Sequence, residues 1–126
     1  MKITPTTIPE VLLIEPRIHH DERGFFLESF RASALAEAGV THPFVQDNHA
    51  QSVKNTVRGL HYQTAPGQAK LLRCTRGAIW DVAVDIRPES ATFGKWVGVE
   101  LDAERYQMLY IPVGFAHGYA ALSDVT

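Results

Sequence analysis

An arginine and a histidine stand three positions apart in the stretch RGLHYQ at residues 58–63, which has the composition of a buried β-strand. Burial of an unpaired polar group costs roughly 2–7 kcal/mol, so Arg58 and His61 would each need a partner or a ligand inside the protein. Histidine changes its charge near neutral pH and serves as a general base in many enzymes. The stretch therefore predicts a pocket in which a ligand is bound and a proton is moved.

The distribution of charge around this stretch favours an anionic ligand. The chain has a formal net charge of −2, which argues against a general affinity for nucleic acid or for an anionic membrane. No Asp or Glu occurs between Asn48 and Trp80, whereas five basic residues do: Lys54, Arg58, Lys70, Arg73 and Arg76. A solvated basic face is the alternative interpretation of this window.

Short strands are expected to carry most of these residues. Eight segments are rich in β-branched and aromatic residues and are separated by turn residues: 11–15, 24–30, 44–48, 57–63, 70–75, 78–86, 95–101 and 106–112. Such spacing is typical of an antiparallel sandwich or barrel. Only residues 31–39 have a helical pattern, with Gly39 at the expected C-terminal end. A chain of 126 residues is expected to form a single domain over 1–126.

A hairpin is predicted between segments 70–75 and 78–86, with its turn at Gly77. In that pairing Lys70 lies diagonally beside Asp81 and Asp85, within reach of its long side chain. Alternation then places both carboxylates on one face of the strand and apolar side chains on the other: Trp80, Val82, Val84 and Ile86. A surface ion pair worth under about 1 kcal/mol is the structural alternative for this cluster.

The compartment is predicted from what the sequence lacks. Cys74 is the only cysteine, which excludes an internal disulfide and fits a reducing environment. The N-terminal residues show no basic segment followed by an apolar run, and no segment approaches the ~20 apolar residues of a membrane span. We therefore expect a cytoplasmic location.

The pattern P-x-G-x-x-H at residues 112–117 resembles the second signature of the cupin β-barrels. The first cupin signature holds a metal with two histidines and a glutamate. Here His61 fills the first histidine position, Gln63 replaces the second, and Lys70 stands where the glutamate would be. An ammonium group in that place repels a divalent cation, so no metal is expected, and a metal-dependent cupin is the less favoured alternative. Lys70 could instead stabilise an enolate or another oxyanion in a water-poor barrel.

Five motifs in the same order resemble the dTDP-4-dehydrorhamnose 3,5-epimerase family over nearly the whole chain: DERGFFLESF (21–30), FVQDNHAQS (44–52), RGLHYQ (58–63), DVAVDIRPESATFGKWVGVEL (81–101) and IPVGFAHGYAALS (111–123). The resemblance implies an all-β, cupin-type jelly-roll barrel of antiparallel strands with one short helix near 31–39. It further implies that the chain acts on dTDP-4-dehydro-6-deoxy-D-glucose at C3 and C5 in dTDP-L-rhamnose biosynthesis, without a cofactor.

The resemblance also implies roles for individual residues. His61 would be the general base, and Lys70 would stabilise the enolate at the 4-keto oxygen. The residues implied to bind the substrate are Arg23, Glu28, Gln46, Asp47, Asn48, Arg58 and His117. Supporting roles are expected for Phe26, Asp81 and Gln63.

The family resemblance further implies that residues from a partner chain and from positions after 126 complete the site. The family resemblance implies a homodimer in which the segment DERGFF enters the partner's site, so that Arg23 and Glu28 act in trans. The family's general-acid tyrosine and the aspartate that orients the base would follow position 126, so the chain is expected to lack the C-terminal part of the family fold. A non-catalytic sugar-nucleotide-binding jelly roll and an epimerase specific for C3 or for C5 stay open as alternatives.

One feature of RGLHYQ conflicts with a shared site. Strict alternation would place Arg58 and His61 on opposite faces of a strand, whereas a common ligand needs both on one face. A β-bulge at Gly59 would re-aim one of the two side chains by one position. We predict this bulge, or a strand that begins only after Gly59.

Overall fold

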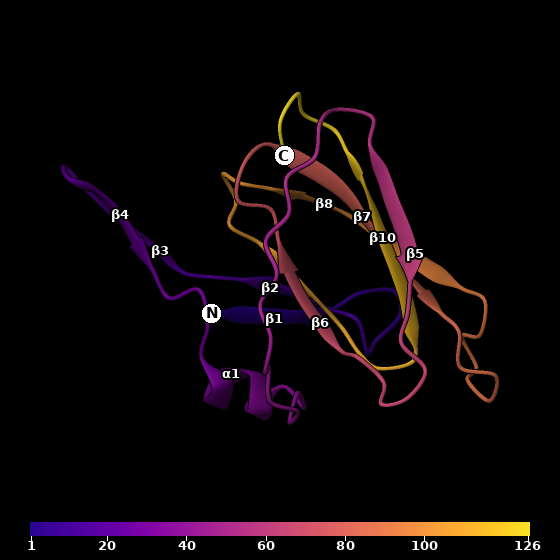
Figure 1. Cartoon of the computed structure of the whole chain (residues 1–126). Coiled ribbons are helices and arrows are strands. Elements are labelled where there is room, and N and C mark those ends of the chain that lie inside the picture. Colours follow the sequence, from indigo (N-terminus) through magenta and orange to yellow (C-terminus); the bar gives the residue numbers. More distant parts are fainter.

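Two four-stranded antiparallel sheets form the body of the protein (Figure 1), in a computed structural model that describes residues 1–126. The first sheet has the strand order β1 (Lys2–Pro5), β2 (Leu12–Glu15), β9 (Met108–Ile111), β6 (Lys70–Arg73). The second has the order β5 (Val57–His61), β10 (Phe115–Ala121), β7 (Ala78–Asp85), β8 (Trp96–Asp102). This jelly roll confirms the expected fold class.

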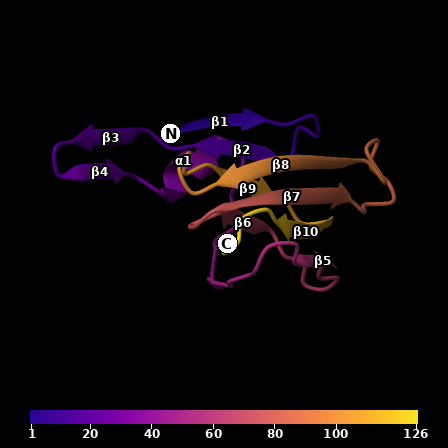
Figure 2. The ribbon, with the colours of Figure 1, turned by 90° about the horizontal axis from the view of Figure 1, so that it is seen from above.

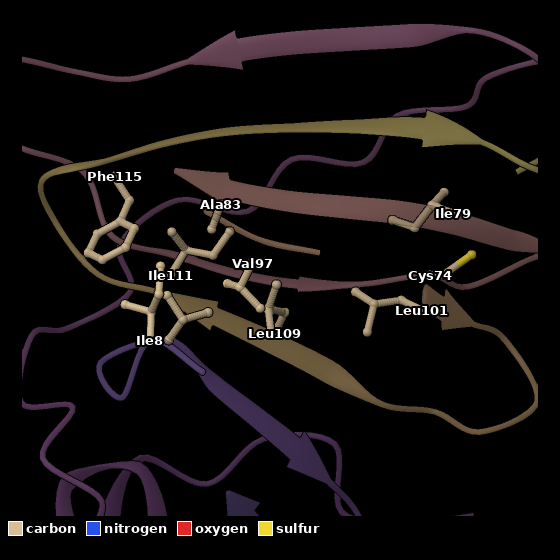
Figure 3. Packing of buried hydrophobic residues seen from close by; sticks show 10 residues of the cluster. Ile8, Cys74, Ile79, Ala83, Val97, Leu101, Leu109, Ile111 and Phe115 are labelled. Carbon is tan, nitrogen blue, oxygen red and sulfur yellow. The ribbon is translucent and has the colours of Figure 1, made fainter. Parts of the chain in front are cut away.

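Apolar side chains from both sheets meet between them (Figure 3). The strand β7 shows why they do so: Ile79 and Ala83 are buried on its inner side, whereas Trp80 on its outer side is 39% exposed. Side chains of a strand alternate between its faces, so a single apolar face per strand suffices to build this core. The ten members of the cluster are Ile8, Val11, Cys74, Ile79, Ala83, Val97, Leu101, Leu109, Ile111 and Phe115.

The predicted hairpin between segments 70–75 and 78–86 is wrong. Strand β6 pairs with β9, and β7 pairs with β10 and β8, so the turn at Gly77 carries the chain from one sheet to the other. Leu72 and Ile79 both pack into the core between the sheets, which is a larger gain in burial than a two-stranded ribbon would offer. The predicted ion pairs of Lys70 with Asp81 and Asp85 are accordingly absent.

Asp85 instead anchors the connection between β7 and β8. Its fully buried carboxylate accepts hydrogen bonds from Arg87 Nε at 2.9 Å, Ser90 Oγ at 2.6 Å and Thr92 Oγ1 at 2.6 Å. Hydrogen bonding from Arg87 is the main cause that holds the pKa of Asp85 well below its ordinary value. The side chain of Arg87 also lies over the ring of Phe115, 4.7 Å from its centroid.

A hairpin of β3 (Ile18–Asp21) and β4 (Gly24–Leu27) projects from the body of the protein (Figures 1 and 2). It is followed by α1 (Ala32–Glu37), which is two residues shorter at its C-terminal end than predicted and is followed by Gly39 at φ 89°. This six-residue helix is much too short to cross a membrane, and the protein has no other helix.

Most predicted strands are present, with ends that coincide or differ by up to three residues. The exception is segment 44–48, which has no regular secondary structure. Strands β1, β3 and β10 were not predicted, although β10 contains the motif histidine His117.

Candidate active site at the open edge of the jelly roll

A bulge in β5 brings Arg58 and His61 to the same face, as predicted. Arg58 stands opposite Tyr119, and His61 stands opposite His117. The two β5 residues are three positions apart and their β10 partners only two, so β5 contains one additional residue. Gly59, at φ 99°, takes up the additional residue. A Cβ atom at this position would lie 2.6 Å from the carbonyl oxygen of His117, so the close approach of the two strands requires glycine.

His61 lies on the inner face of the second sheet, the face that looks toward the first sheet. His117 stands opposite Ala83 as well as His61, and Ala83 belongs to the core between the sheets. Residues that stand opposite each other in neighbouring strands share a face. The prediction that RGLHYQ is a buried strand is nevertheless wrong: β5 is an edge strand, and all five of its residues are exposed.

Lys70 reaches the same space from the other sheet. It stands opposite Ile111, a core residue, and so faces inward from β6. Both β5 and β6 are edge strands, and they lie on the same side of the sandwich (Figure 2). His61 on β5 thus points toward the first sheet, and Lys70 on β6 points toward the second sheet, along the same open edge of the sandwich.

The ammonium group of Lys70 is unusual because its Nζ atom is buried and has no hydrogen-bond partner. Burial lowers the pKa of Lys70 below its ordinary value. An unsatisfied buried donor of this kind costs about 1–3 kcal/mol. A cation kept in such a place is typical of a site that binds an anion or stabilises a developing negative charge.

His117 is fixed by a buried carboxylate. Its Nε2 donates to Oδ2 of Asp81 at 2.8 Å, and Asp81 is fully inaccessible to solvent. Burial raises the pKa of Asp81, against the opposing effect of the hydrogen bond from His117. The other carboxylate oxygen, Oδ1, has no partner. Asp81 therefore belongs to the site through His117 and not through Lys70.

Arg58 is held by two oxygen atoms that the sequence did not single out. Its Nε donates to Ser52 Oγ at 2.9 Å and its Nη2 to the backbone oxygen of Gln51 at 3.2 Å. Ser52 Oγ lies 2.8 Å from the hydroxyl of Tyr119. Ser52 ends the motif FVQDNHAQS and Tyr119 lies in IPVGFAHGYAALS, but neither motif indicates that the two side chains meet.

A cavity of about 650 Å³ lies beside these residues, between segment 44–50 and the edge strand β6. Three of the predicted binding residues line it, namely Gln46, Asp47 and Asn48, together with Tyr119. Gln46 Nε2 donates to Asn48 Oδ1 at 3.1 Å. The cavity lining does not include the other four inward-facing residues predicted for the site: Arg58, His61, Lys70 and His117.

The remaining predicted residues lie outside this group. Arg23 is on the projecting hairpin and bonds Asp21, and Glu28 pairs with Arg31 at 3.1 Å. Phe26, on the same hairpin, is 72% exposed. Gln63 donates to the backbone oxygen of Pro66 at 2.8 Å in an exposed loop.

No group of three or more His, Cys, Asp or Glu side chains is arranged to hold a metal ion. The polar groups that the inward faces bring to this edge are two imidazoles, an ammonium, a guanidinium and one carboxylate. The fold is a jelly roll of the cupin type whose open edge carries these groups.

The chain belongs to the dTDP-4-dehydrorhamnose 3,5-epimerase family, whose model matches residues 5–126. It is 56% identical over 126 residues to the dTDP-4-dehydrorhamnose 3,5-epimerase of Shigella flexneri, covering 98% of this chain and 70% of that relative. The family named from the sequence motifs is thus confirmed.

Solved structures agree with this assignment. The 3,5-epimerase of Legionella pneumophila, solved in complex with dTDP-4-keto-L-rhamnose, superimposes with a TM-score of 0.95 at 51% identity; the match covers 98% of this chain and 66% of that one. The 3,5-epimerase of Bacillus anthracis, solved with TDP and PPi bound, gives a TM-score of 0.93 at 44% identity and covers 98% of this chain and 73% of that one. This chain therefore spans about two thirds of the length of the Legionella protein.

Proposed function

We propose that this chain forms the catalytic jelly roll of an enzyme that epimerises dTDP-4-dehydro-6-deoxy-D-glucose at C3 and C5, in dTDP-L-rhamnose biosynthesis. The observation that carries this proposal is the bulge at Gly59, which puts Arg58 and His61 on the face that also holds His117. Similarity supports the double reaction: the Shigella relative is named for both carbons at 56% identity, and a Streptomyces niveus 3-epimerase is 40% identical.

The chemistry follows from the ketone at C4 of the sugar, which acidifies the hydrogens at C3 and C5. His61 takes each proton in turn, and the electron pair of the broken C–H bond moves onto the ketone oxygen to form an enolate. A proton supplied by solvent then returns to the same carbon from the opposite face of the ring, which inverts that carbon and restores the ketone, and His61 releases its proton to water before the second round. No oxidant, reductant or metal is consumed in this sequence.

Lys70 stabilises the enolate in this proposal. Its buried Nζ has no partner within the chain, so an oxyanion would satisfy a donor that is otherwise left unpaired. A fixed positive charge at the position where negative charge develops lowers the barrier more than it favours the neutral ground state. The same reasoning explains why a costly buried lysine would be retained.

The nucleotide part of the substrate is assigned to Arg58 and to segment 46–48. Arginine suits a diphosphate because its planar guanidinium can donate two parallel hydrogen bonds. Gln46, Asp47 and Asn48 line the adjacent cavity and supply amide and carboxylate groups for the sugar and base. His117 is held by Asp81 through Nε2, which leaves its other ring nitrogen free to form a hydrogen bond with the substrate.

A homodimer completes the site in this proposal, with Arg23 and Glu28 of one chain binding the nucleotide held by the other. The hairpin that carries Arg23 projects away from its own body (Figure 1). Two of its aromatic side chains are open to solvent, Phe25 at 51% and Phe26 at 72%. Exposed aromatic residues on a projecting element are a typical contact for a partner surface.

Mixing of two inactive chains tests the shared site. A dimer of one Arg23→Ala chain and one His61→Ala chain holds one site in which both residues are intact, if Arg23 acts in trans. Random mixing should then restore about a quarter of the wild-type number of sites. No restoration, with dimers present in the mixture, would place Arg23 in the site of its own chain.

Solvent exchange tests the reaction itself. Proton NMR of the 4-keto sugar in D₂O should show deuterium entering both C3 and C5 when the wild-type chain is added. Tight binding of dTDP without any exchange would instead favour a non-catalytic protein that binds sugar nucleotides. Exchange at one carbon alone would identify an epimerase of single specificity.

A further inference from the structure

Three side chains from separate segments form a hydrogen-bonded chain at the edge of the candidate site. Arg58 on β5 donates through Nε to Ser52 Oγ at 2.9 Å, and Ser52 Oγ lies 2.8 Å from the hydroxyl of Tyr119 on β10. Tyr119 stands opposite Arg58 in the sheet and also lines the 650 Å³ cavity. The guanidinium is thus tied to the wall of the cavity through two hydroxyl groups.

Ser52 is a rigid member of this chain. It is only 4% exposed, and its backbone is fixed by two hydrogen bonds with Thr126, each 2.9 Å long. A bridge between Val53 and Val125 continues this pairing. The hydroxyl of Ser52 therefore has a fixed origin from which to orient the arginine.

Several hydrogen-bond donors of Arg58 and of the two hydroxyl groups have no acceptor within the chain. A guanidinium has five N–H donors, and Arg58 uses two of them on Ser52 and on the backbone of Gln51, which leaves three. Ser52 and Tyr119 share one mutual hydrogen bond, so one of their two hydroxyl hydrogens also has no acceptor within the chain. The ion pairs of the protein are formed by other residues, and no carboxylate neutralises Arg58. The group is rich in donors and poor in acceptors.

We propose that Ser52 and Tyr119 are positioning residues that hold Arg58 for a phosphate group of the nucleotide. The hydroxyl pair fixes Nε, so that the outer edge of the guanidinium presents its free donors to the phosphate oxygens. Pre-orientation of this kind increases affinity because less side-chain freedom is lost on binding. This proposal rests on the proposed function, since it takes the nucleotide as the ligand.

A mutant cycle on dTDP affinity, measured by calorimetry, tests the proposal. Ser52→Ala and Tyr119→Phe should each weaken dTDP binding about tenfold, or about 1.4 kcal/mol, when Arg58 is present. In an Arg58→Ala background the same two changes should alter the affinity less than about twofold, because they act only through the arginine. An equal loss in both backgrounds, or no loss in either, would overturn the positioning role.

A second measurement reports on the arginine without any ligand. The exchange of the Arg58 Nε proton with water, followed by ¹⁵N NMR, should become at least about tenfold faster in Ser52→Ala and Tyr119→Phe. Unchanged exchange in both variants would overturn the role of the hydroxyl pair. Failure of the wild-type chain to bind dTDP would overturn the proposed nucleotide site and is a separate result.

Two control variants separate positioning from general effects of a lost hydroxyl. Tyr62→Phe removes a hydroxyl from a side chain that is 59% exposed, and Ser33→Ala removes one from α1. Both should leave dTDP affinity and Arg58 exchange at wild-type values. Thermal unfolding of all four variants should confirm that differences in affinity do not follow differences in stability.

Discussion

His117 and Asp81 form the most deeply buried polar pair at the candidate site, with Nε2 of His117 2.8 Å from Oδ2 of Asp81. The carboxyl group of Asp81 has no accessible surface, and its Oδ1 atom has no partner. Removal of one member of such a pair leaves the other buried without compensation, which is more costly than removal of both.

The pair should therefore show strong coupling in stability. His117→Ala should lower the free energy of unfolding by about 3 kcal/mol, because it leaves the Asp81 carboxylate isolated. Addition of Asp81→Asn to that variant should recover a large part of the loss. Urea unfolding at pH 7 measures both, and additive effects of the two changes within about 0.5 kcal/mol would show that the residues are independent.

Gly59 should be intolerant of any side chain. Gly59→Ala places a Cβ atom 2.6 Å from the carbonyl oxygen of His117 and also imposes a positive φ on alanine. Gly94→Ala is the matched control, since Gly94 has φ 75° with open space around it. We expect a cost of about 1–2 kcal/mol at Gly94, from the backbone conformation alone, and a clearly larger cost at Gly59.

The same variant also tests the geometry of the site. Loss of the bulge would return Arg58 and His61 to opposite faces, so Gly59→Ala should lose exchange activity even at a temperature where it is folded. Equal unfolding free energies for the two alanine variants, or an active Gly59→Ala protein, would contradict the account of the bulge.

Asp85 should make the protein sensitive to acid. Its pKa is lowered in the folded state, chiefly by hydrogen bonding from Arg87, so its contribution is fully present above the unfolded value of about 3.9 and is lost as pH falls toward the folded value. Asp85→Asn should cost about 3 kcal/mol at pH 7, and the difference from wild type should shrink below about pH 4.

A surface aspartate provides the comparison for this effect. Asp124→Asn affects a side chain that is 94% exposed and lies 3.8 Å from Lys54, and it should cost under about 1 kcal/mol at any pH. Denaturant unfolding between pH 2 and pH 7 measures both variants. A difference between wild type and Asp85→Asn that does not change with pH would contradict the assigned role of the buried carboxylate.

Lys70 should lower the free energy of unfolding of the protein while it supports the exchange of the sugar hydrogens. Lys70→Met removes an unsatisfied buried ammonium and should stabilise the free protein by about 1 kcal/mol at pH 7 while it abolishes exchange of the sugar hydrogens. Because burial lowers the pKa of Lys70, wild-type stability should rise as pH increases from the folded pKa toward about 10.4, and the advantage of the variant should disappear there.

The control for Lys70 is an exposed lysine. Lys54→Met affects a side chain that is 56% exposed and lies 3.8 Å from Asp124, so it should change neither stability by more than about 0.5 kcal/mol nor exchange activity. A destabilised Lys70→Met protein would show that the ammonium is satisfied in the folded state, which would remove the argument for an unpaired donor.

Local patterns in the sequence predicted most strands and the bulge, because both depend on neighbouring residues. Alternation in β7 was predicted, and the conflict between Arg58 and His61 identified Gly59 as the bulged position. The pairing of β6 could not be predicted in the same way. A turn at Gly77 fits a hairpin and also fits a crossing between sheets, and only the packing of Leu72 and Ile79 against the opposite sheet decides between them.

The candidate site was predicted mainly through motif resemblance, and its details depend on tertiary contacts. Asp81 was assigned to Lys70 because the pairing of β6 was wrong, whereas the structure gives it to His117. Ser52 and Tyr119 are 67 positions apart and share no motif, so their contact could not be predicted from spacing. The exposure of β5 was also missed, because an edge strand and a central strand can have the same composition.

Deuterium exchange by a His61→Ala chain tests the central claim most directly. The 4-keto sugar is incubated in D₂O with wild type, with His61→Ala, and with His42→Ala as a matched exposed histidine, and the C3 and C5 signals are followed by proton NMR. The account predicts exchange at both carbons with wild type and His42→Ala, and none above background with His61→Ala, whose dTDP affinity stays within a few-fold of wild type. Exchange by His61→Ala at the wild-type rate would contradict the account and assign the base to another residue.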